Sequence, residues 1–455
     1  MDAEIGALTV IFTEFYYWLT VALMFFIHIG FCMYEVSASR QKNMMHTMMK
    51  NTMLIPLVTI TFYFFGWWIY WAFPNGPGII PGGIPDNAAA NAPWSETMGP
   101  HMQDRITGVF WAAFLLFSWT AASIVSGAVI ERIRSASFWL IAVLIGSVTW
   151  IIDAAWGWKD DGWMVQVLGY HDAYASGVIH AIAGGTALGV LALLGPRIGK
   201  FAADGTPRNL RPHNPWLVAI GLFFIYTGFW GFYVACNVPI IASGDIGAEA
   251  GFFTATTIYL TPTTLSAITV NFLMSLAAGL LVGYVVSRGD AFWTYSSGLA
   301  GIIAASAGND LYHPVQAMII AGLGVWFMYR MHYWVERRFK IDDAVGAVAV
   351  HGYAGFFGVV AAGFVLWGYP ASTTYDVVIT PWGQLIGAII MFFVLGLVPG
   401  LIAAWILNSA GVLRIPREIE LVGLDIAEYH GRYLDEEQIT EAERAEASGT
   451  GPTGS

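Results

Sequence analysis

The sequence predicts an all-α polytopic membrane protein with about eleven transmembrane helices, and three observations carry that prediction. Hydrophobic residues make up 57% of the 455 residues and charged residues only 11%, whereas a soluble domain carries about 25% charged residues. Apolar runs long enough for one helical crossing, roughly 18 residues or more, recur along the whole chain. Basic residues, finally, collect in alternate loops.

The apolar runs are separated by polar or Gly- and Pro-rich connections, and each is long enough to cross a hydrocarbon core of about 30 Å. The N-terminal sequence MDAEIGALTV lacks the positive region of a signal peptide, so we expect the first run to be retained. The expected spans cover residues 8–33, 51–73, 107–130, 136–156, 174–195, 215–236, 263–287, 292–308, 313–330, 344–367 and 384–408.

The basic residues predict the orientation, because loops rich in Lys and Arg stay in the cytoplasm. Only Arg105 and Lys159 flank the opposite face. The N-terminus is therefore expected outside and the C-terminus in the cytoplasm, across the inner or plasma membrane of the cell. The basic residues of the inner side are Arg40, Lys42, Lys50, Arg132, Arg134, Arg197, Lys200, Arg208, Arg211, Arg288, Arg330, Arg337, Arg338, Lys340, Arg414 and Arg417.

The remaining segments are expected to be connections and a tail. The loop 74–106, with the sequence FPNGPGIIPGGIPDNAAANAPW, is typical of turns, and 236–262 forms a second long external segment. We expect a membrane domain over 1–410 and a cytoplasmic tail over 411–455, whose end, EASGTGPTGS, is expected to be disordered. The tail is too small for a catalytic domain, so the chain is not expected to be an enzyme. No basic stripe indicates nucleic acid.

Two stretches in opposite halves of the chain share one pattern. In DAYASGVIHAIAGGTALG (172–189), Asp172 precedes His180 by eight positions, and in DAVGAVAVHGYAGFFG (343–358) Asp343 precedes His351 by the same spacing. Eight helical residues span about 12 Å. Because the two spans run in opposite directions, both histidines are expected near the midplane. This indicates an inverted repeat of five plus five spans and a final helix, with a transport site between the repeats.

A symmetric pair of histidines inside a membrane favours a functional role over simple packing. Ionisable groups in spans are costly and usually mark a pathway or a proton relay. An imidazole donates through one ring nitrogen and accepts through the other, so two adjacent rings can pass a proton. Ligation of haem or another metal is the alternative that this pair leaves open.

Several motifs in a consistent order now carry a resemblance. The run DAYASGVIHAIAGGTALGVLALLGPRIGKF resembles the signature of the Amt/Mep/Rh ammonium transporters, and GPRIGKF and HPVQAMIIAG resemble the Amt branch. The resemblance extends over roughly 8–433. Its other motifs are SRQKNMMHTMMKN, SGAVIERIR, HNPWLVAIGLFFIYTGFWGF, FKIDDAVGAVAVHGYAGFFG and GLDIAEYHG.

The resemblance implies a set of site residues. His180 and His351 correspond to twin histidines lining the pore, and Asp343 is the inner counterpart of Asp172. Phe117 and Phe232 correspond to a stacked phenylalanine gate above them. The outer ammonium site is expected to comprise Trp156, Phe117, Cys236 and Asp172, with Asp172 orienting local structure rather than touching the ligand.

The resemblance also implies the function. It predicts the Amt fold and a homotrimer that captures ammonium at the outer aromatic site, removes a proton, and conducts ammonia through an apolar pore with proton co-translocation. No cofactor is implied. A PII-type regulator at the cytoplasmic face is compatible with the sequence. An ammonium sensor of the same fold, with little or no transport, is the alternative.

Some residues depart from the family's pattern. Cys236 stands where the family usually has a serine, and Tyr233 where it has an asparagine, so we expect the outer site to bind ammonium less tightly or to gain an aromatic face. Tyr429 interrupts the C-terminal motif, which puts coupling through the tail in question. Glu35, at the inner end of the first span, is expected to pair with basic residues.

Overall fold

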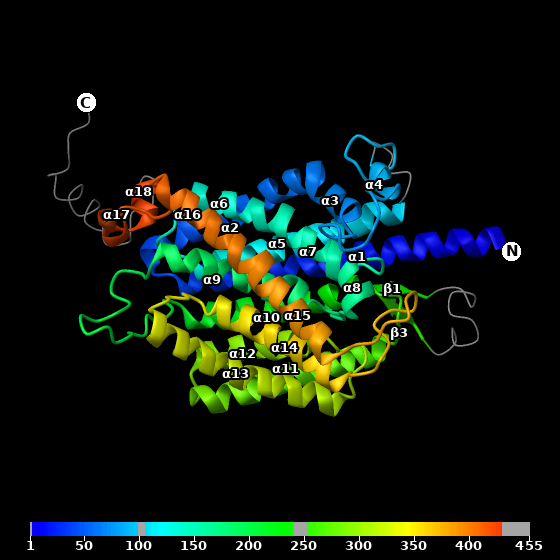
Figure 1. Cartoon of the computed structure of the whole chain (residues 1–455). Coiled ribbons are helices and arrows are strands. Elements are labelled where there is room, and N and C mark those ends of the chain that lie inside the picture. The colour runs from blue at the N-terminus through cyan, green and yellow to red at the C-terminus, as the bar shows by residue number, and fades with distance from the viewer. Residues whose placement is uncertain (1, 99–104, 241–252, 430–455) are drawn as a thin grey trace, which may run out of the picture.

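The computed structural model describes residues 2–98, 105–240 and 253–429 (Figure 1). Among these residues, nine helical runs are long and apolar enough to cross a membrane. Helices α12 (Ala291–Ser306) and α13 (Pro314–Phe339) pack with α11 (Leu265–Ser287), which is consistent with the eleven spans that the sequence predicts. The chain is a mostly helical, multi-pass membrane protein.

The first half of the chain supplies five crossings, some of them built from two helices joined by a π-helical segment. Phe62–Gly66 and Ile145–Thr149 join two helices each, and a third π-helical segment, Ser176–Ala181, directly precedes α9. The α-helices are α1 (Asp2–Ala38), α2 (Met44–Thr61), α3 (Trp67–Ala72), the short α4 (Asn87–Ala90), α5 (Arg105–Ala128), α6 (Ser135–Leu144), α7 (Trp150–Gly157), the short α8 (Trp163–Leu168) and α9 (Ile182–Leu194).

The second half repeats the scheme and adds one crossing and two short helices. Its π-helical segments are Val348–Tyr353 and Ile390–Leu397. Besides α11, α12 and α13, its helices are α10 (Pro215–Ala235), α14 (Ala354–Val365), α15 (Pro381–Ile389), α16 (Val398–Ser409), α17 (Arg417–Val422) and α18 (Leu424–Tyr429).

The segment 236–262, which was expected to be external, contains strands that the sequence analysis did not predict. Strands β1 (Asn237–Pro239), β2 (Ala255–Thr257) and β3 (Pro262–Thr263) form an antiparallel sheet in the order β1-β2-β3. The sheet lies at the same end of the bundle as the start of α1, and α17 and α18 lie at the opposite end (Figure 1). The three strands and the two short helices therefore lie at opposite ends of the bundle.

The sequence signals at helix starts explain where several spans begin. Pro215 occupies the first turn of α10, where its missing N–H costs nothing, and the Asn214 side chain accepts from the Leu217 N–H. Helix α13 begins with a reciprocal capping box between His313 and Gln316. Such caps satisfy backbone donors that would otherwise lie unpaired at the helix ends.

Two spans are longer than their apolar runs predict. Helix α13 was expected to end near 330 but continues to Phe339, because its last turn carries exposed cations that favour a helix C-terminus. The second crossing begins at Gln41 rather than 51. It does so because Lys50 and Asn51 are buried with a partner: Glu35 accepts from the Asn51 Nδ2 at 2.9 Å and lies 3.8 Å from the Lys50 Nζ.

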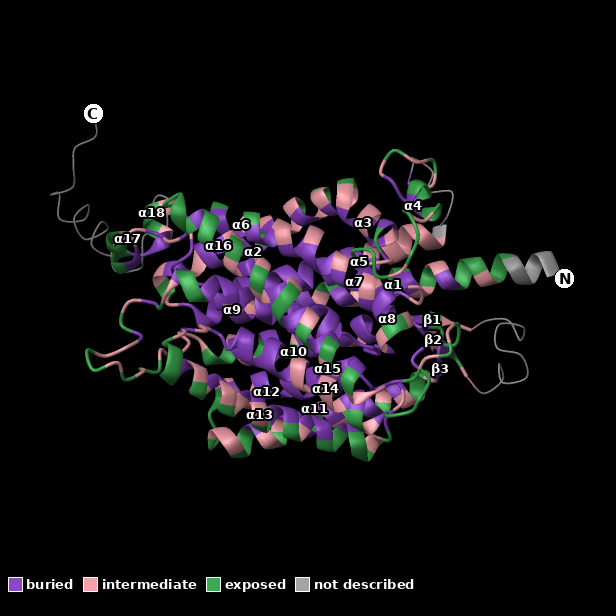
Figure 2. Ribbon diagram, viewed as in Figure 1, coloured by how far each residue is buried: buried purple, intermediate pink, exposed green. Residues whose placement is uncertain are grey.

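The two halves meet through glycines. A Cβ added to Gly30 of α1 would lie 2.5 Å from the Gly221 carbonyl oxygen of α10, and one added to Gly184 of α9 would lie 2.2 Å from the Gly352 Cα. Both pairs join the corresponding spans of the two halves, as an inverted repeat requires, and only glycine allows backbones to approach so closely. Buried residues gather along this central seam, and exposed ones lie at the periphery (Figure 2).

The start of the tail packs on the residues that connect α1 and α2 and on the start of α2. The Asp425 carboxylate accepts from the backbone N–H groups of Met45 and His46 at 2.9 and 2.8 Å, and the Asn43 side chain accepts from the Leu424 N–H at 3.0 Å. The end of the tail, which was expected to be disordered, lies outside the described residues.

Candidate functional site

The two predicted histidines meet at the centre of the bundle. The Nδ1 atoms of His180 and His351 lie 3.1 Å apart, and their ring planes are inclined by 28°. Both side chains are buried, and the His180 Nε2 has no hydrogen-bond partner within the described parts of the chain. One Nδ1 must donate and the other accept, so the pair shares a single proton between its rings.

Glycine packing accounts for this meeting. Each histidine lies in a π-helical segment, Ser176–Ala181 or Val348–Tyr353, directly before α9 or α14. A Cβ on Gly355 would come within 2.1 Å of the Ser176 carbonyl oxygen. The first segment therefore lies backbone to backbone against the start of α14, directly after the second segment, which brings the side chains of the two histidines into contact. Such π-helical turns are frequent at functional sites, but hydrophobic periodicity does not distinguish them from α-helix.

Asp172 holds the start of the first histidine segment. Its carboxylate accepts from the backbone N–H groups of Ser176, Gly177 and Val178 at 2.7, 2.7 and 2.9 Å, and from the Tyr170 hydroxyl at 3.2 Å. A carboxylate at a helix N-terminus both accepts the free donors and interacts favourably with the helix dipole. Asp172 thus positions the segment that carries His180, and its oxygens are occupied by protein donors.

Asp343 repeats this arrangement at the start of the second histidine segment. Its carboxylate accepts from the backbone N–H groups of Ala347 and Ala349 at 2.8 and 3.2 Å, at the start of the segment that carries His351. Burial raises the pKa of Asp343 to about 7, although these two bonds act in the opposite direction. The Asp–His spacing found in the sequence therefore corresponds to one local structure used twice.

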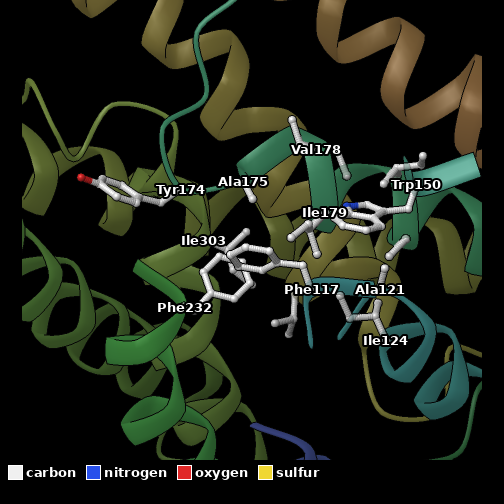
Figure 3. Close-up of a cluster of buried hydrophobic side chains, with 14 of the residues drawn as sticks. Phe117, Ala121, Ile124, Trp150, Tyr174, Ala175, Val178, Ile179, Phe232 and Ile303 are labelled. Carbon is white, nitrogen blue, oxygen red and sulfur yellow. The ribbon is translucent and has the colours of Figure 1, made fainter. Parts of the chain in front are cut away.

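Aromatic rings cover the outer side of the histidine pair. The rings of Phe117 and Phe232 lie 4.8 Å apart between centroids, and Figure 3 shows them side by side in the buried cluster. Their planes meet at 84°, so the pair is edge-to-face rather than stacked as the family resemblance implies. This geometry brings the positive edge of one ring to the negative face of the other. Phe232 in turn stacks on His180 at 5.7 Å.

Trp158, and not Trp156, packs against this pair. The Trp158 ring lies 4.9 Å from Phe117, and its indole N–H donates to the Asp172 carbonyl oxygen at 3.0 Å. Trp156 packs on Trp163 at 5.7 Å instead. The sequence WGWKDDGW offers three tryptophans at short spacing, and spacing alone does not tell which one faces Phe117.

A depression of about 340 Å³ opens at the end of the bundle that carries the sheet, and Cys236 is among its lining residues. The Cys236 thiol donates to the Phe232 carbonyl oxygen at 3.2 Å. The Lys159 Nζ also faces this depression. It lies 5.0 Å from the Trp71 ring centroid and 2.8 Å from an Asp161 oxygen. The ammonium group of Lys159 therefore occupies part of this aromatic depression. The sequence analysis did not identify Lys159 as a site residue.

Tyr233 has a structural environment. Its ring stacks on Tyr174 at 4.2 Å, and its hydroxyl bonds to the Ser306 hydroxyl and accepts from the Asn309 side chain at 2.6 and 3.0 Å. Tyr174 points away from the two phenylalanine rings in Figure 3. These contacts account for the tyrosine at this position without a ligand.

The geometry of the histidine pair does not fit axial ligation of haem. Axial nitrogens on opposite sides of a metal are separated by two metal–nitrogen bonds, about 4 Å, and a macrocycle must pass between the rings. The observed separation is 3.1 Å. Among the described residues, no group of three or more His, Cys, Asp or Glu side chains is arranged to hold a metal ion. The pair is instead arranged for hydrogen bonding and proton exchange.

Comparison with known sequences gives matches along most of the chain. The model of the Ammonium Transporter Family matches residues 15–433. Ammonium transporter Amt2 of Methanocaldococcus jannaschii is 31% identical over 426 residues, which cover 92% of this chain and 90% of that protein. Ammonium transporter Amt2 of Archaeoglobus fulgidus is 30% identical over 435 residues, which cover 90% and 85%.

Solved structures share the fold. A structure titled Sensor Amt Protein superposes with a TM-score of 0.75 at 23% identity and covers 93% of this chain and 99% of that one. Candida albicans Mep2 gives 0.69 at 18% identity, with 89% and 86% covered. Nitrosomonas europaea Rh50 gives 0.62 at 19% identity, with 97% of each chain covered.

Proposed function

This chain belongs to the Ammonium Transporter Family, and from that premise we propose that it captures ammonium outside the cell and conducts ammonia through the pore of each subunit. The family consists of transporters and channels rather than enzymes. The observation that carries the proposal is the His180–His351 pair, buried beneath an aromatic gate and joined Nδ1 to Nδ1 at 3.1 Å.

We propose that ammonium enters through the outer depression that Cys236 lines and binds beneath it, between Cys236 and the buried rings of Phe117 and Trp158. A cation over an aromatic face gains about 0.5–2 kcal/mol as it loses water. Trp158 supports this assignment in place of Trp156, because it packs directly against Phe117. Asp172 acts by holding the first histidine segment, since its oxygens are bonded to protein donors.

The apolar passage favours the neutral species. An isolated ion in a low-dielectric interior costs far more than a cation–π contact returns, whereas ammonia carries no net charge. Ammonium therefore gives up a proton before it passes Phe117 and Phe232. Potassium gains similar cation–π energy but has no proton to lose, so the requirement for deprotonation excludes it.

The histidine pair offers the released proton a path. With the His180 Nδ1–H donating to the His351 Nδ1, the His180 Nε2 presents a lone pair. A proton added there makes His180 an imidazolium, its Nδ1 proton moves to the His351 Nδ1, and His351 releases its Nε2 proton towards the inside. Ammonia crosses separately and is reprotonated in the cytoplasm. This transfer leaves His180 protonated at Nε2 and His351 at Nδ1, so both rings must return to their starting tautomers before the next proton enters. Each completed cycle then carries in one ammonium ion, and with it one positive charge.

The test is an electrical measurement on purified protein in proteoliposomes on a supported membrane. An ammonium jump should evoke a current that saturates with concentration, and potassium at the same concentration should evoke none. Radiolabelled methylammonium uptake reports transport without charge movement. Uptake without current would reject proton co-translocation and keep the channel.

An ammonium sensor is the second function that we consider, and the outer site supports it. Cys236 offers a poorer hydrogen-bond partner than the serine usual in the family, and Phe117 and Phe232 pack edge to face and are both fully buried. Ammonium binding with neither current nor uptake would favour sensing.

We further propose a homotrimer inserted with its N-terminus outside and its C-terminus in the cytoplasm. The inner end carries a depression of about 300 Å³ whose lining includes Arg208, Arg211 and Arg337. This cationic surface supports docking of a PII-type regulator there. Mass photometry in nanodiscs checks the trimer, and a pull-down with the regulator checks the docking.

A further inference from the structure

Glu35 is a glutamate buried in the inner half of the bundle, near the end of α1. Its side chain is fully buried. One of its oxygens, Oε2, accepts from the Ser126 hydroxyl at 2.6 Å and from the Asn51 Nδ2 at 2.9 Å, and the Lys50 Nζ lies 3.8 Å away. All three of these interactions therefore involve the same oxygen, Oε2.

The other oxygen, Oε1, is buried and has no hydrogen-bond partner among the described residues. The ammonium group of Lys50 does not turn to it, because its Nζ donates to the Ser126 carbonyl oxygen at 2.7 Å and lies over the Phe138 ring at 5.0 Å. A buried acceptor without a donor is costly. The ion pair with Lys50 explains why a glutamate is tolerated, but it leaves Oε1 unexplained.

Oε1 borders a small cavity below the histidine pair. A Cβ added to Gly127 would lie 3.4 Å from the Glu35 Oε1 and 2.6 Å from a methyl group of Val345, so both groups lie beside the same glycine. The cavity has a volume of about 10 Å³, close to the smallest volume that holds one water molecule, roughly 10–15 Å³. Its lining includes Phe31, Tyr34, Glu35, Gly127, Val345 and His351.

We infer that the Glu35 Oε1 is an inner binding site that accepts an N–H group of ammonia or ammonium after it passes His351. The inference rests on the proposed function. The cavity places one small molecule between His351 and a carboxylate oxygen, and ammonia has the size of water and three N–H donors. The carboxylate accepts only, whereas an imidazole also donates, so Glu35 also favours the charged form as ammonia is reprotonated.

The sharpest variant is Glu35→Gln, because the neighbouring donors fix its orientation. Asn51 and Ser126 donate to the Oε2 position, which the amide oxygen of a glutamine must therefore occupy. Its NH₂ then replaces Oε1 and presents a donor to the cavity. We expect at least a tenfold lower ammonium-evoked uptake by the folded protein, with unchanged ammonium binding at the outer site and a lower unfolding temperature, because Lys50 loses its buried partner. Ser126→Ala is the matched control, since it removes a bond to Oε2 and keeps Oε1.

Two further variants keep the test decisive if Glu35→Gln does not assemble. Glu35→Gln combined with Lys50→Met replaces the ion pair with neutral groups, and Gly127→Ala places a methyl group beside Oε1 without changing any charge. Both are expected to lower uptake at least tenfold. A folded protein with either substitution that transports like the wild type would overturn the inference.

An infrared measurement separates this inference from the proposed function. The ammonium-induced difference spectrum of the wild type should contain a carboxylate band that Glu35→Gln removes and Ser126→Ala retains. A protein with that band but without transport would reject the proposed function and keep the site. A transporting protein whose spectrum and uptake are unchanged by Glu35→Gln would reject the site and keep the function.

Discussion

The Nδ1 atoms of His180 and His351 face each other at 3.1 Å, with no other ionisable group between them. At this distance the two nitrogens share one proton, so the rings hold complementary tautomers. Exchange of that proton reverses which ring donates. The rings are held for this exchange by Phe229 and Phe232, which stack on His180 at 5.7 Å each.

Replacement of either histidine should break the relay. We expect His180→Ala and His351→Ala each to abolish the ammonium-evoked current, because one ring alone cannot pass a proton across the pair, or to admit potassium through water that fills the space of the lost ring. Solid-supported membrane currents with ammonium and with potassium check both outcomes. Unchanged current and selectivity in both variants would contradict the relay.

Lys159→Met should raise the apparent affinity for ammonium. The Lys159 Nζ lies over the Trp71 ring and beside Asp161 at the outer depression, where it competes with an incoming cation for the same surface. Removal of the charge should make the binding free energy of ammonium more favourable by about 0.5–1 kcal/mol. This corresponds to a roughly two- to fivefold lower half-saturating concentration. Because Lys159 is buried, added salt should change this difference only slightly. A variant with unchanged affinity at low salt would show that the lysine does not compete.

The sequence carried most of the fold and the centre of the site. Long apolar runs predicted the crossings, because a span is specified by hydrophobicity over many residues. The repeated Asp–His spacing predicted that His180 and His351 face each other. The π-helical segments could not be predicted in this way, since one added residue per turn hardly changes an all-apolar pattern. Strands β1 to β3 were missed because the loop 236–262 shows no clear alternation.

Details that depend on which side chain meets which ring were not accessible from sequence. Trp156 and Trp158 both suit an outer aromatic site by composition, and only the packing on Phe117 separates them. Tyr233 was expected to add an aromatic face to the outer site, yet its partners are Tyr174 and Ser306. These contacts join residues far apart in the chain, which no local pattern encodes.

Asp172→Asn should destabilise the first histidine segment. Oδ1 accepts from one backbone N–H and Oδ2 from two, so the NH₂ of an asparagine would face a donor in either orientation. A charge-assisted bond contributes about 1.5–3 kcal/mol, and we expect the free energy of unfolding to fall by about 2–3 kcal/mol. Chemical unfolding in detergent checks this. Asp343→Asn, which loses fewer bonds, is the matched comparison, and an equal loss in both variants would contradict the explanation.

Asp153→Ala should stabilise the protein. Asp153 is fully buried in α7, and neither of its carboxyl oxygens has a hydrogen-bond partner in the part of the chain that the structure describes. Alanine is smaller than aspartate and has no polar atoms, so it fits the site without overpacking and removes two unsatisfied acceptors worth about 1–3 kcal/mol. The thermal unfolding temperature should rise and ammonium transport should persist. Lower transport in a more stable protein would assign Asp153 a role in the pathway.

Cys236→Ser should strengthen ammonium binding at the outer depression. The Cys236 thiol donates to the Phe232 carbonyl oxygen at 3.2 Å, and a serine hydroxyl at this position can do the same while keeping two lone pairs for a cation. A net hydrogen bond contributes about 0.5–1.5 kcal/mol, so the dissociation constant should fall about two- to tenfold. Ligand-induced thermal shifts across an ammonium titration measure it.

The second cysteine supplies the control for that measurement. Cys32 lines a separate cavity with His28 and Asn51, away from the outer depression, so Cys32→Ser should leave ammonium binding unchanged. Cys236→Ala, which lacks any acceptor, should bind no more tightly than the wild type. Equal affinities for Cys236→Ser and Cys236→Ala would mean that the side chain at 236 does not contact ammonium. The weak outer site would then have to be explained by Lys159 alone, which the double variant Lys159→Met with Cys236→Ser tests directly.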